Sequence, residues 1–240
     1  MIQPIKILML CVSSLLLTGC ATQAKHKSDP LEGLNRGIYA INRTVDKLAI
    51  KPIAKVYDAV IPKPVKKGVH NFFENLNDIP TIANGVLQGR FPQAISDSTR
   101  FLVNSTLGIG GIFDVADHWG LQKHKADFGQ TLALWGYRDS TYLVLPFFGP
   151  STVRDGVGRV ATYYMSVWPY IKKVKVRNIM FASYVIDTRA SLLGNEAIME
   201  EAASGDEYAW VRDAYLRHRQ YEIDGETSEA NDERLLGPPS

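Results

Sequence analysis

Apolar side chains in the first third of the chain recur at steps of three and four residues, which places them on one face of an α-helix. Two such rows occur: Leu34, Ile38, Ile41, Val45 and Leu48, then Val65, Val69, Phe72, Leu76 and Ile79. Because proline disrupts helices, we expect Pro52 to end the first helix or start the next piece, and the second helix to end before Pro80. The prolines of Ile61–Pro64 predict a rigid turn between the two helices.

Three further helices are predicted by the same periodicity. One starts at Pro92 and is expected to face inward with Ile95, Thr99, Leu102 and Val103. Another carries Val185, Leu192, Leu193 and Ile198, and the last carries Tyr208, Val211, Tyr215 and His218 on one face. Ser204–Glu207 has the spacing of a capping box at the start of the last helix. Residues 222–240 are acidic and end in prolines, which predicts a disordered tail.

The first 19 residues have the features of a secretion signal. Lys6 precedes the apolar run Ile7–Leu17, which is too short to cross a bilayer of about 30 Å. Leu17–Cys20 has the form of a bacterial lipobox, in which small residues precede a cysteine that is acylated. We therefore expect cleavage before Cys20 and a diacylglycerol and an N-acyl chain on its thiol and amine; the alternative is a plain signal peptide.

The acylated end determines where we expect the protein to reside. Two or three acyl chains anchor a protein firmly, whereas one chain holds it weakly. Residues 20–30 are polar and basic and predict a flexible tether between the lipid and the folded part, which we expect to span residues 31–221. Ala21 stands where an aspartate is the usual signal for retention in the inner membrane, so the outer membrane is predicted, with the protein facing the periplasm.

Residues 101–171 are poor in charge and rich in aromatic side chains. They contain ten charged residues in 71 and 13 of the 24 aromatic residues. Glycine and proline interrupt the three uncharged runs 101–113, 141–153 and 160–171, and none is long enough to cross a bilayer as a straight helix. This composition fits two interpretations: the buried core of a soluble domain, or broken apolar elements in a membrane that pack on protein or line a wet cavity.

The acids of this region also have two interpretations. Asp114, Asp117, Asp127, Asp139 and Asp155 are its carboxylates. A charge within membrane-facing protein is costly and usually faces a partner or a water-filled passage. They could form a polar rim that passes a lipid headgroup, or they could form salt bridges with Arg138, Arg154 and Arg159.

Enzymatic motifs are largely missing from the sequence. It has no G-x-S-x-G, P-loop or H-E-x-x-H pattern, so we expect no enzyme, no metal site and no cofactor apart from the acyl chains. Gly156–Ala161 matches G-x-G-x-x-A, but no buried strand precedes it, and Thr152–Asp155 fits a helix start better. The net charge of +2 gives no basis for nucleic-acid binding.

Five ordered motifs resemble the MlaA (VacJ) lipoproteins of Gram-negative outer membranes. They are Asp29–Arg36 (DPLEGLNR), Arg100–Asp114 (RFLVNSTLGIGGIFD), Phe128–Leu132 (FGQTL) with Trp135–Gly136, Leu145–Asp155 (LPFFGPSTVRD) and Asp187–Ala190 (DTRA). Together they extend from about residue 29 to 221, which leaves out the acidic tail.

The resemblance implies an all-α fold, a ring of amphipathic helices lying in the outer membrane around an amphipathic channel. It implies that mislocalised phospholipids leave the outer leaflet through this channel and pass to a soluble periplasmic carrier of the MlaC type, which maintains lipid asymmetry, and that a trimeric porin binds the ring. The candidate channel and gate residues are Gly108, Gly110, Gly111, Phe113, Asp114, Lys123, Lys125, Asp127, Phe128, Gly129, Trp135, Gly136, Pro146, Phe147, Phe148, Gly149, Arg154 and Asp155.

Two other functions remain open at this point. The chain could be a structural lipoprotein that scaffolds porins or the envelope, or a lipid hydrolase that pairs His118 or His124 with Ser105 or Ser151. Within the channel hypothesis, residues 120–136 carry charges between glycines and could form a mobile hairpin that gates the mouth; the alternative is a static loop.

Overall fold

The computed structural model describes residues 28–196, 201, 203 and 205–236. The predicted signal, Cys20 and most of the predicted tether therefore lie outside the described residues. The predicted all-α fold is confirmed, with one small addition. Within the described residues its α-helices are α2 (Glu32–Val45), α3 (Lys51–Val60), α4 (Lys63–Leu87), α5 (Phe91–Thr106), α6 (Val115–His118), α7 (Phe128–Leu134), α8 (Val153–Met165), α9 (Val174–Ser191) and α11 (Glu207–Leu236). The addition is a hairpin in which β1 (Tyr142–Leu145) pairs antiparallel with β2 (Gly149–Thr152).

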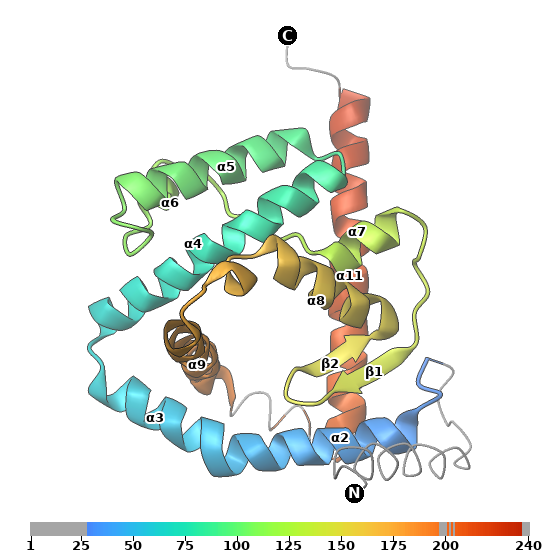
Figure 1. Cartoon of the computed structure of the whole chain (residues 1–240). Coiled ribbons are helices and arrows are strands. Elements are labelled where there is room, and N and C mark those ends of the chain that lie inside the picture. The colour runs from blue at the N-terminus through green and yellow to red at the C-terminus, as the bar shows by residue number, and fades with distance from the viewer. Residues whose placement is uncertain (1–27, 197–200, 202, 204, 237–240) are drawn as a thin grey trace, which may run out of the picture.

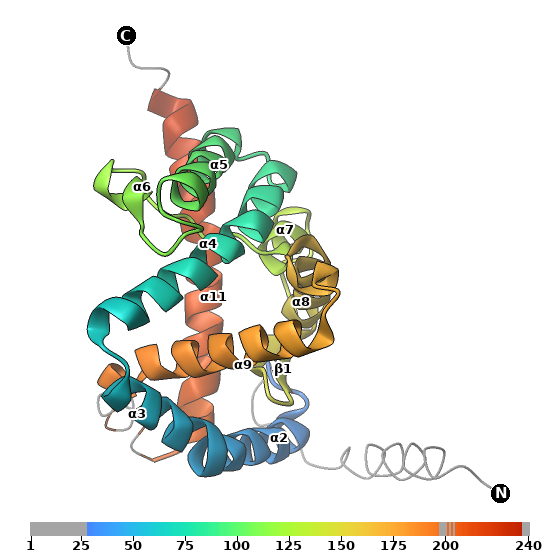
Figure 2. The same cartoon turned by 60° about the vertical axis from the view of Figure 1, so that its left-hand side comes forward.

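The helices are arranged as a ring (Figure 1). In this view α2 and α3 form its lower side, α4 forms the left and upper side, and α7 and α8 lie opposite. The hairpin and α9 extend into the ring, α5 packs on α4, and α9 packs on α3. Figure 2 shows α9 running across the ring while α11 stands upright behind it. Among the described residues, no helix combines the length and apolarity that crossing a membrane requires.

The prolines have different effects along the first helices. Pro52 lies at the start of α3, after a π-helical segment Asp46–Ile50, and Ile61–Pro62 separates α3 from α4, as predicted. The predicted end before Pro80 is wrong, because α4 continues through it to Leu87. The second half of α4 is held by packing on α5, where Gly85 lies against Ala94, and this contact outweighs the hydrogen bond that Pro80 cannot make.

The predicted orientation of α5 is wrong. Its buried positions include Asp97, Arg100 and Asn104, whereas the side chains of Ile95 and Leu102 are 67% and 61% exposed. The Arg100 guanidinium donates to Asp114 over 2.9 Å, and the Asn104 amide donates to the same carboxylate over 2.9 Å. Polar groups therefore fill the interface between α5 and the α6 loop, and the apolar side of α5 faces outward.

A conventional core lies where α2, the hairpin and α11 meet. Tyr142, Val144 and Tyr208 are buried there, and Ile38, Tyr39, Tyr215 and Leu216 pack against them. Asn35 of α2 is fully buried and fixes the hairpin, since it donates to the Tyr142 carbonyl and accepts from the Val144 N–H at 2.9 Å. A buried amide with these partners pays no desolvation penalty.

The end of the chain differs from the prediction. α11 continues as a helix to Leu236, so the tail expected to be disordered from residue 222 is helical over its described part; residues 237–240 lie outside it. The helix start is capped by Asp206, whose carboxylate accepts the Ala209 N–H, while Ser204 lies outside the described residues. His218 is exposed rather than buried on the face with Tyr208.

Candidate functional site

A cavity of about 830 Å³ lies inside the ring between the hairpin turn, α8 and α9. Most of its wall is apolar and comes from Leu145, Pro146, Phe148, Val160, Tyr163, Tyr164, Trp168 and Phe181, with Arg159, Arg177 and Asn178 as its polar groups. We call this cavity the apolar chamber. Ligand pockets of this size and composition accept molecules with large apolar parts.

A second cavity of about 390 Å³ adjoins the chamber, and we call it the polar vestibule. Its wall includes the charged side chains of Asp127, Asp155, Arg219 and Glu222. The two cavities share four wall residues, Arg159, Tyr163, Trp168 and Phe181, so they are contiguous. The ring therefore holds an apolar cavity and a charged cavity side by side.

The sequence of α8 explains its place in both cavities. The Thr152 hydroxyl accepts the Asp155 N–H at the first turn of α8. This confirms the predicted helix start, which was preferred to a dinucleotide-binding turn. Gly156, Arg159, Val160 and Tyr163 then follow at helical spacing along the chamber. Gly158 allows α7 to approach closely, since a Cβ there would lie 2.4 Å from the Gly129 nitrogen.

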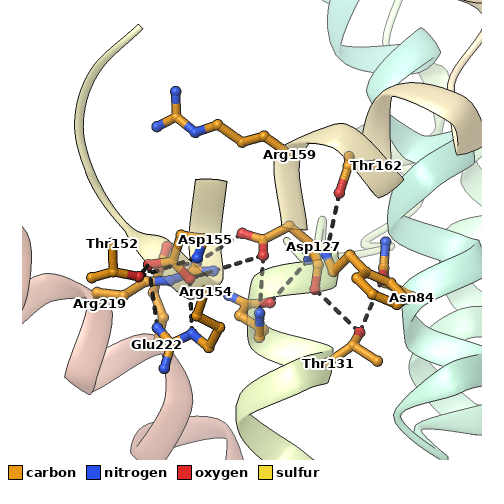
Figure 3. A network of polar contacts seen from close by, with 12 residues as sticks. Asn84, Asp127, Thr131, Thr152, Arg154, Asp155, Arg159, Thr162, Arg219 and Glu222 are labelled. Atoms are coloured by element: carbon orange, nitrogen blue, oxygen red, sulfur yellow. Dashed lines mark hydrogen bonds and ion pairs between the residues drawn. The ribbon is translucent and has the colours of Figure 1, made fainter. Parts of the chain in front are cut away.

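The vestibule wall is an ion-pair network (Figure 3). The carboxylate of Asp155 binds Arg154 at 2.9 Å and Arg219 at 3.0 Å, and it accepts the Tyr215 hydroxyl at 2.8 Å. Arg219 also binds Asp127 at 2.6 Å. The salt-bridge interpretation of these acids is thus correct for Arg154 and Asp155, although Arg219, far along the chain, was not foreseen.

The network keeps the Asp155 carboxylate ionised. Burial alone would raise the pKa of Asp155, but the Arg154 and Arg219 guanidinium groups outweigh it and lower the pKa to about 2. Burial likewise acts to lower the pKa of Arg219, and the hydrogen bond with Asp127 more than reverses this. Groups held in one charge state by such partners position the helices and do not exchange protons near neutral pH.

The expected gate segment has a different form from the one predicted. Residues 121–127 run as an irregular strap and α7 follows, so a hairpin does not form. Lys123 binds Glu74 at 2.9 Å and Asp78 at 3.0 Å, and His124 contacts Asp97 at 3.0 Å. Lys125 is exposed.

These contacts give the two acids of α4 opposite pKa shifts. Burial raises the pKa of Asp78 more than Lys123 lowers it, while at Glu74 the lysine outweighs burial and the pKa falls.

The glycine-rich motif lies away from the central cavities, in the turn between α5 and α6. A Cβ on Gly108 would lie 2.2 Å from the Phe113 carbonyl, and Gly111 has a φ of +91° and lies against Asn75, so both glycines are needed for the turn. Gly110 has a positive φ in the same turn. Phe113 and Asp114 line another apolar cavity, of about 790 Å³, between α4 and α9.

The remaining predicted residues divide between the hairpin turn and α7. Pro146 and Phe148 line the chamber, and Phe147 between them is 74% exposed with a φ of 65°. Gly149 completes this turn with a φ of +77°. In α7, Trp135 packs edge-on against Phe128 and donates to the Leu87 carbonyl at 3.2 Å, and Gly136 follows with a φ of +112°.

The pairs required for a lipid hydrolase do not form. The His118 ring contacts the Asp114 carbonyl and the His124 ring contacts Asp97. The Ser151 hydroxyl is fully buried and donates to the Thr152 carbonyl, and the Ser105 hydroxyl accepts from Asn75. Neither histidine therefore has a serine to activate.

Sequence reasoning found Pro146, Phe148, Asp127 and Asp155 of the joined cavities and missed most of the rest. The missed wall residues include Arg159, Tyr163, Tyr164, Trp168, Arg177, Phe181, Arg219 and Glu222. The signal for α8 was present as residues 156, 159, 160 and 163 at helical spacing. No local pattern indicates that α9 and α11 complete the site.

Comparison with known proteins identifies close relatives. A family model described as MlaA lipoprotein matches residues 27–222. The intermembrane phospholipid transport system lipoprotein MlaA of Escherichia coli (strain K12) is 34% identical over 229 residues, covering 90% of this chain and 88% of that protein. The protein of the same name from Haemophilus influenzae is 29% identical over 237 residues, covering 94% of each chain.

The fold has a solved counterpart as well. A structure described as "Structural basis for maintenance of bacterial outer membrane lipid asymmetry" superposes with a TM-score of 0.71 at 30% identity. The match covers 82% of this chain and 100% of that chain, so the ring is common to both.

Proposed function

Because the chain belongs to the MlaA lipoprotein family, we propose that it is the lipoprotein of a phospholipid transport system and that the joined cavities are its lipid path. The observation that carries this proposal is that the apolar chamber and the polar vestibule adjoin at four shared wall residues. A phospholipid has the same division into apolar chains and a charged headgroup. The chamber suits the chains, and the vestibule and its boundary suit the headgroup.

The outer surface of the ring supports a location in a membrane. Large apolar side chains are exposed on two helices outside the chamber wall: Ile53, Val56 and Val60 on α3, and Phe91, Ile95 and Leu102 on α5. Exposed apolar surface of this extent indicates contact with a membrane or a protein. We therefore propose that the ring lies within one leaflet and is anchored through acylated Cys20.

The direction of transport and the partners are part of the same proposal. We propose that the ring lies in the outer membrane, faces the periplasm, and removes mislocalised phospholipids from the outer leaflet. A soluble periplasmic carrier would receive them, and a trimeric porin would hold the ring in place. The names of the relatives place them in intermembrane phospholipid transport, which supports the movement of phospholipid.

A plug in the chamber tests the proposal. Gly156 lines the chamber, and a Cβ there would meet only side-chain atoms at 3.8 Å or more, so Gly156→Trp can be accommodated while filling the space. Gly37→Trp on α2 is the matched control, since a Cβ there meets nothing within 4 Å. The readout is the amount of outer-leaflet phosphatidylethanolamine that an impermeant amine reagent labels in cells.

We expect the plug to raise this labelling to the level of cells that lack the protein, and the control to leave it at the wild-type level. Both variants should be present in the outer membrane in wild-type amounts. If the plugged protein keeps outer-leaflet labelling low, the chamber is not the lipid path, and a scaffold for porins or the envelope becomes the better account.

A further inference from the structure

The charged groups of the apolar chamber are of one sign. Among the described residues, its wall contains two arginines, Arg159 on α8 and Arg177 on α9, and the amide of Asn178, but no carboxylate. The adjoining vestibule contains Asp127, Asp155 and Glu222, yet each of these already binds Arg219, and Asp155 also binds Arg154. A ligand that enters the chamber therefore meets a wall whose two charged side chains are both positive.

These two arginines differ from the arginines of the rest of the ring. Arg100, Arg154, Arg189 and Arg219 each bind at least one carboxylate at 3.0 Å or less. Arg159 instead donates to the main-chain carbonyls of Phe148 and Pro150, and Figure 3 shows its guanidinium directed away from the acid network. Within the described part of the chain, Arg177 makes no side-chain hydrogen bond or ion pair.

The chemistry of guanidinium identifies the ligand group. Its planar fork of N–H donors matches a phosphate in two-point contacts, and such charge-assisted bonds strengthen where water is scarce. Two carbonyl bonds hold Arg159 across the hairpin turn and leave further N–H groups of its five for a ligand. The apolar wall around both arginines requires that this phosphate be attached to hydrocarbon chains.

We propose that Arg159 and Arg177 form a headgroup site that selects anionic phospholipids, such as phosphatidylglycerol, over zwitterionic ones. This inference rests on the proposed lipid path and adds the headgroup preference to it. A phosphatidylethanolamine would bring an ammonium group next to two guanidinium groups, and the nearby carboxylates are already paired. A headgroup without a cation meets no such repulsion, so it binds more strongly.

The test uses the full-length acylated protein in nanodiscs of phosphatidylethanolamine. Each preparation contains a trace of one photoactivatable lipid, either phosphatidylglycerol or phosphatidylethanolamine, with the same diazirine acyl chain. Adducts on chamber peptides are counted by mass spectrometry. We expect wild-type protein to give roughly 30-fold more adducts with phosphatidylglycerol, as about 1 kcal/mol from each of the two arginines implies.

The variants separate the two arginines from charge in general. Arg159→Gln with Arg177→Gln should lower the phosphatidylglycerol adducts to the phosphatidylethanolamine level and leave the latter unchanged. Lys175→Gln is the matched control, because it removes a charge from an exposed position of α9 outside the chamber wall, and it should keep the wild-type ratio. Arg177→Lys keeps the positive charge at the same position and should keep most of the preference. This result would show that the loss in the double variant comes from the lost charge and not from a folding defect.

The outcomes distinguish this inference from the proposed function. Equal adducts of both lipids on chamber peptides of the wild type would overturn the headgroup preference and leave the lipid path intact. The absence of adducts with either lipid would overturn the lipid path itself. Displacement of the lipid by an excess of soluble glycerol phosphate would show a site for a free anion and would also overturn the lipid assignment.

Discussion

The interface of α5 with the α6 loop and the core beneath the hairpin are built in opposite ways. At α5, Arg100, Asp114 and Asn104 lie inside and Ile95 and Leu102 lie outside. Beneath the hairpin, Tyr142, Val144 and Tyr208 lie inside, as they do in a protein surrounded by water. The difference fits the proposed membrane location, in which hydrocarbon lies against the outer face of α5 and water lies near α11.

Breaking the polar interface between α5 and the α6 loop should lower the free energy of unfolding more than the changes in the other regions. Arg100→Leu leaves the Asp114 carboxylate without its guanidinium partner; since Asp114 is 28% exposed, we expect a cost of about 3 kcal/mol, the lower end of the range for a buried pair. The measurement is the free energy of unfolding by urea in mild detergent. A loss below about 1 kcal/mol would mean that the polar interior of this region is solvated and contributes little to stability.

The pH dependence of stability tests whether paired charges in the vestibule also stabilise the fold. The pKa of Asp155 is about 2 in the fold and near 3.9 in an unfolded chain, so its ionised form stabilises the fold above about pH 4. This contribution, on the order of 2 kcal/mol, should be lost as the pH falls from about 4 to 2. Asp155→Asn should lower stability at pH 7 and flatten this part of the pH profile; an unchanged profile would contradict the role of the network.

The outer face of α5 can be tested by its affinity for membranes. In a Cys20→Ala background, which removes the acyl anchor, Ile95→Asp should weaken vesicle binding roughly tenfold, since a charge within the apolar region costs on the order of 1–3 kcal/mol. Stability in detergent should change by less than about 0.5 kcal/mol, because the side chain is exposed. Tyr221→Asp on α11, at an equally exposed position, is the control and should bind like the parent; equal binding of both variants would argue against a lipid-facing α5.

The smallest effect is expected in the conventional core. The Tyr142 hydroxyl is buried and has no hydrogen-bond partner in the described part of the chain. Tyr142→Phe removes only this group, so the free energy of unfolding should stay within about 0.5 kcal/mol of wild type or rise slightly. A loss above about 1 kcal/mol would mean that the hydroxyl has a partner, such as a buried water, and that this core is more polar than described.

The contrast between the regions also explains what the sequence could predict. Periodicity located α2, α4 and the start of α5, because it depends on the helix repeat alone. It assigned the wrong side of α5 to the interior, because the usual rule assumes water outside. The end of α4 was misplaced at Pro80, since packing on α5 outweighs a local breaker.

The candidate site was predicted only in part, for a different reason. The hairpin turn and Asp155 fall within one recognisable motif, Leu145–Asp155. Arg219 pairs with Asp127 across 92 residues, and no local pattern specifies such a contact. The glycine-rich motif was taken for a channel wall because its composition suits one, whereas its glycines serve the turn after α5.

The central claim, that phospholipid occupies the joined cavities, is tested most directly at Tyr163, which lines both of them. A photocrosslinking amino acid placed there should form covalent phospholipid adducts in native outer membranes. The same residue at Tyr221, which is 72% exposed on α11, should form none. Adducts at Tyr163 alone are the predicted result; adducts at neither position, with the protein folded and in the membrane, would contradict the claim.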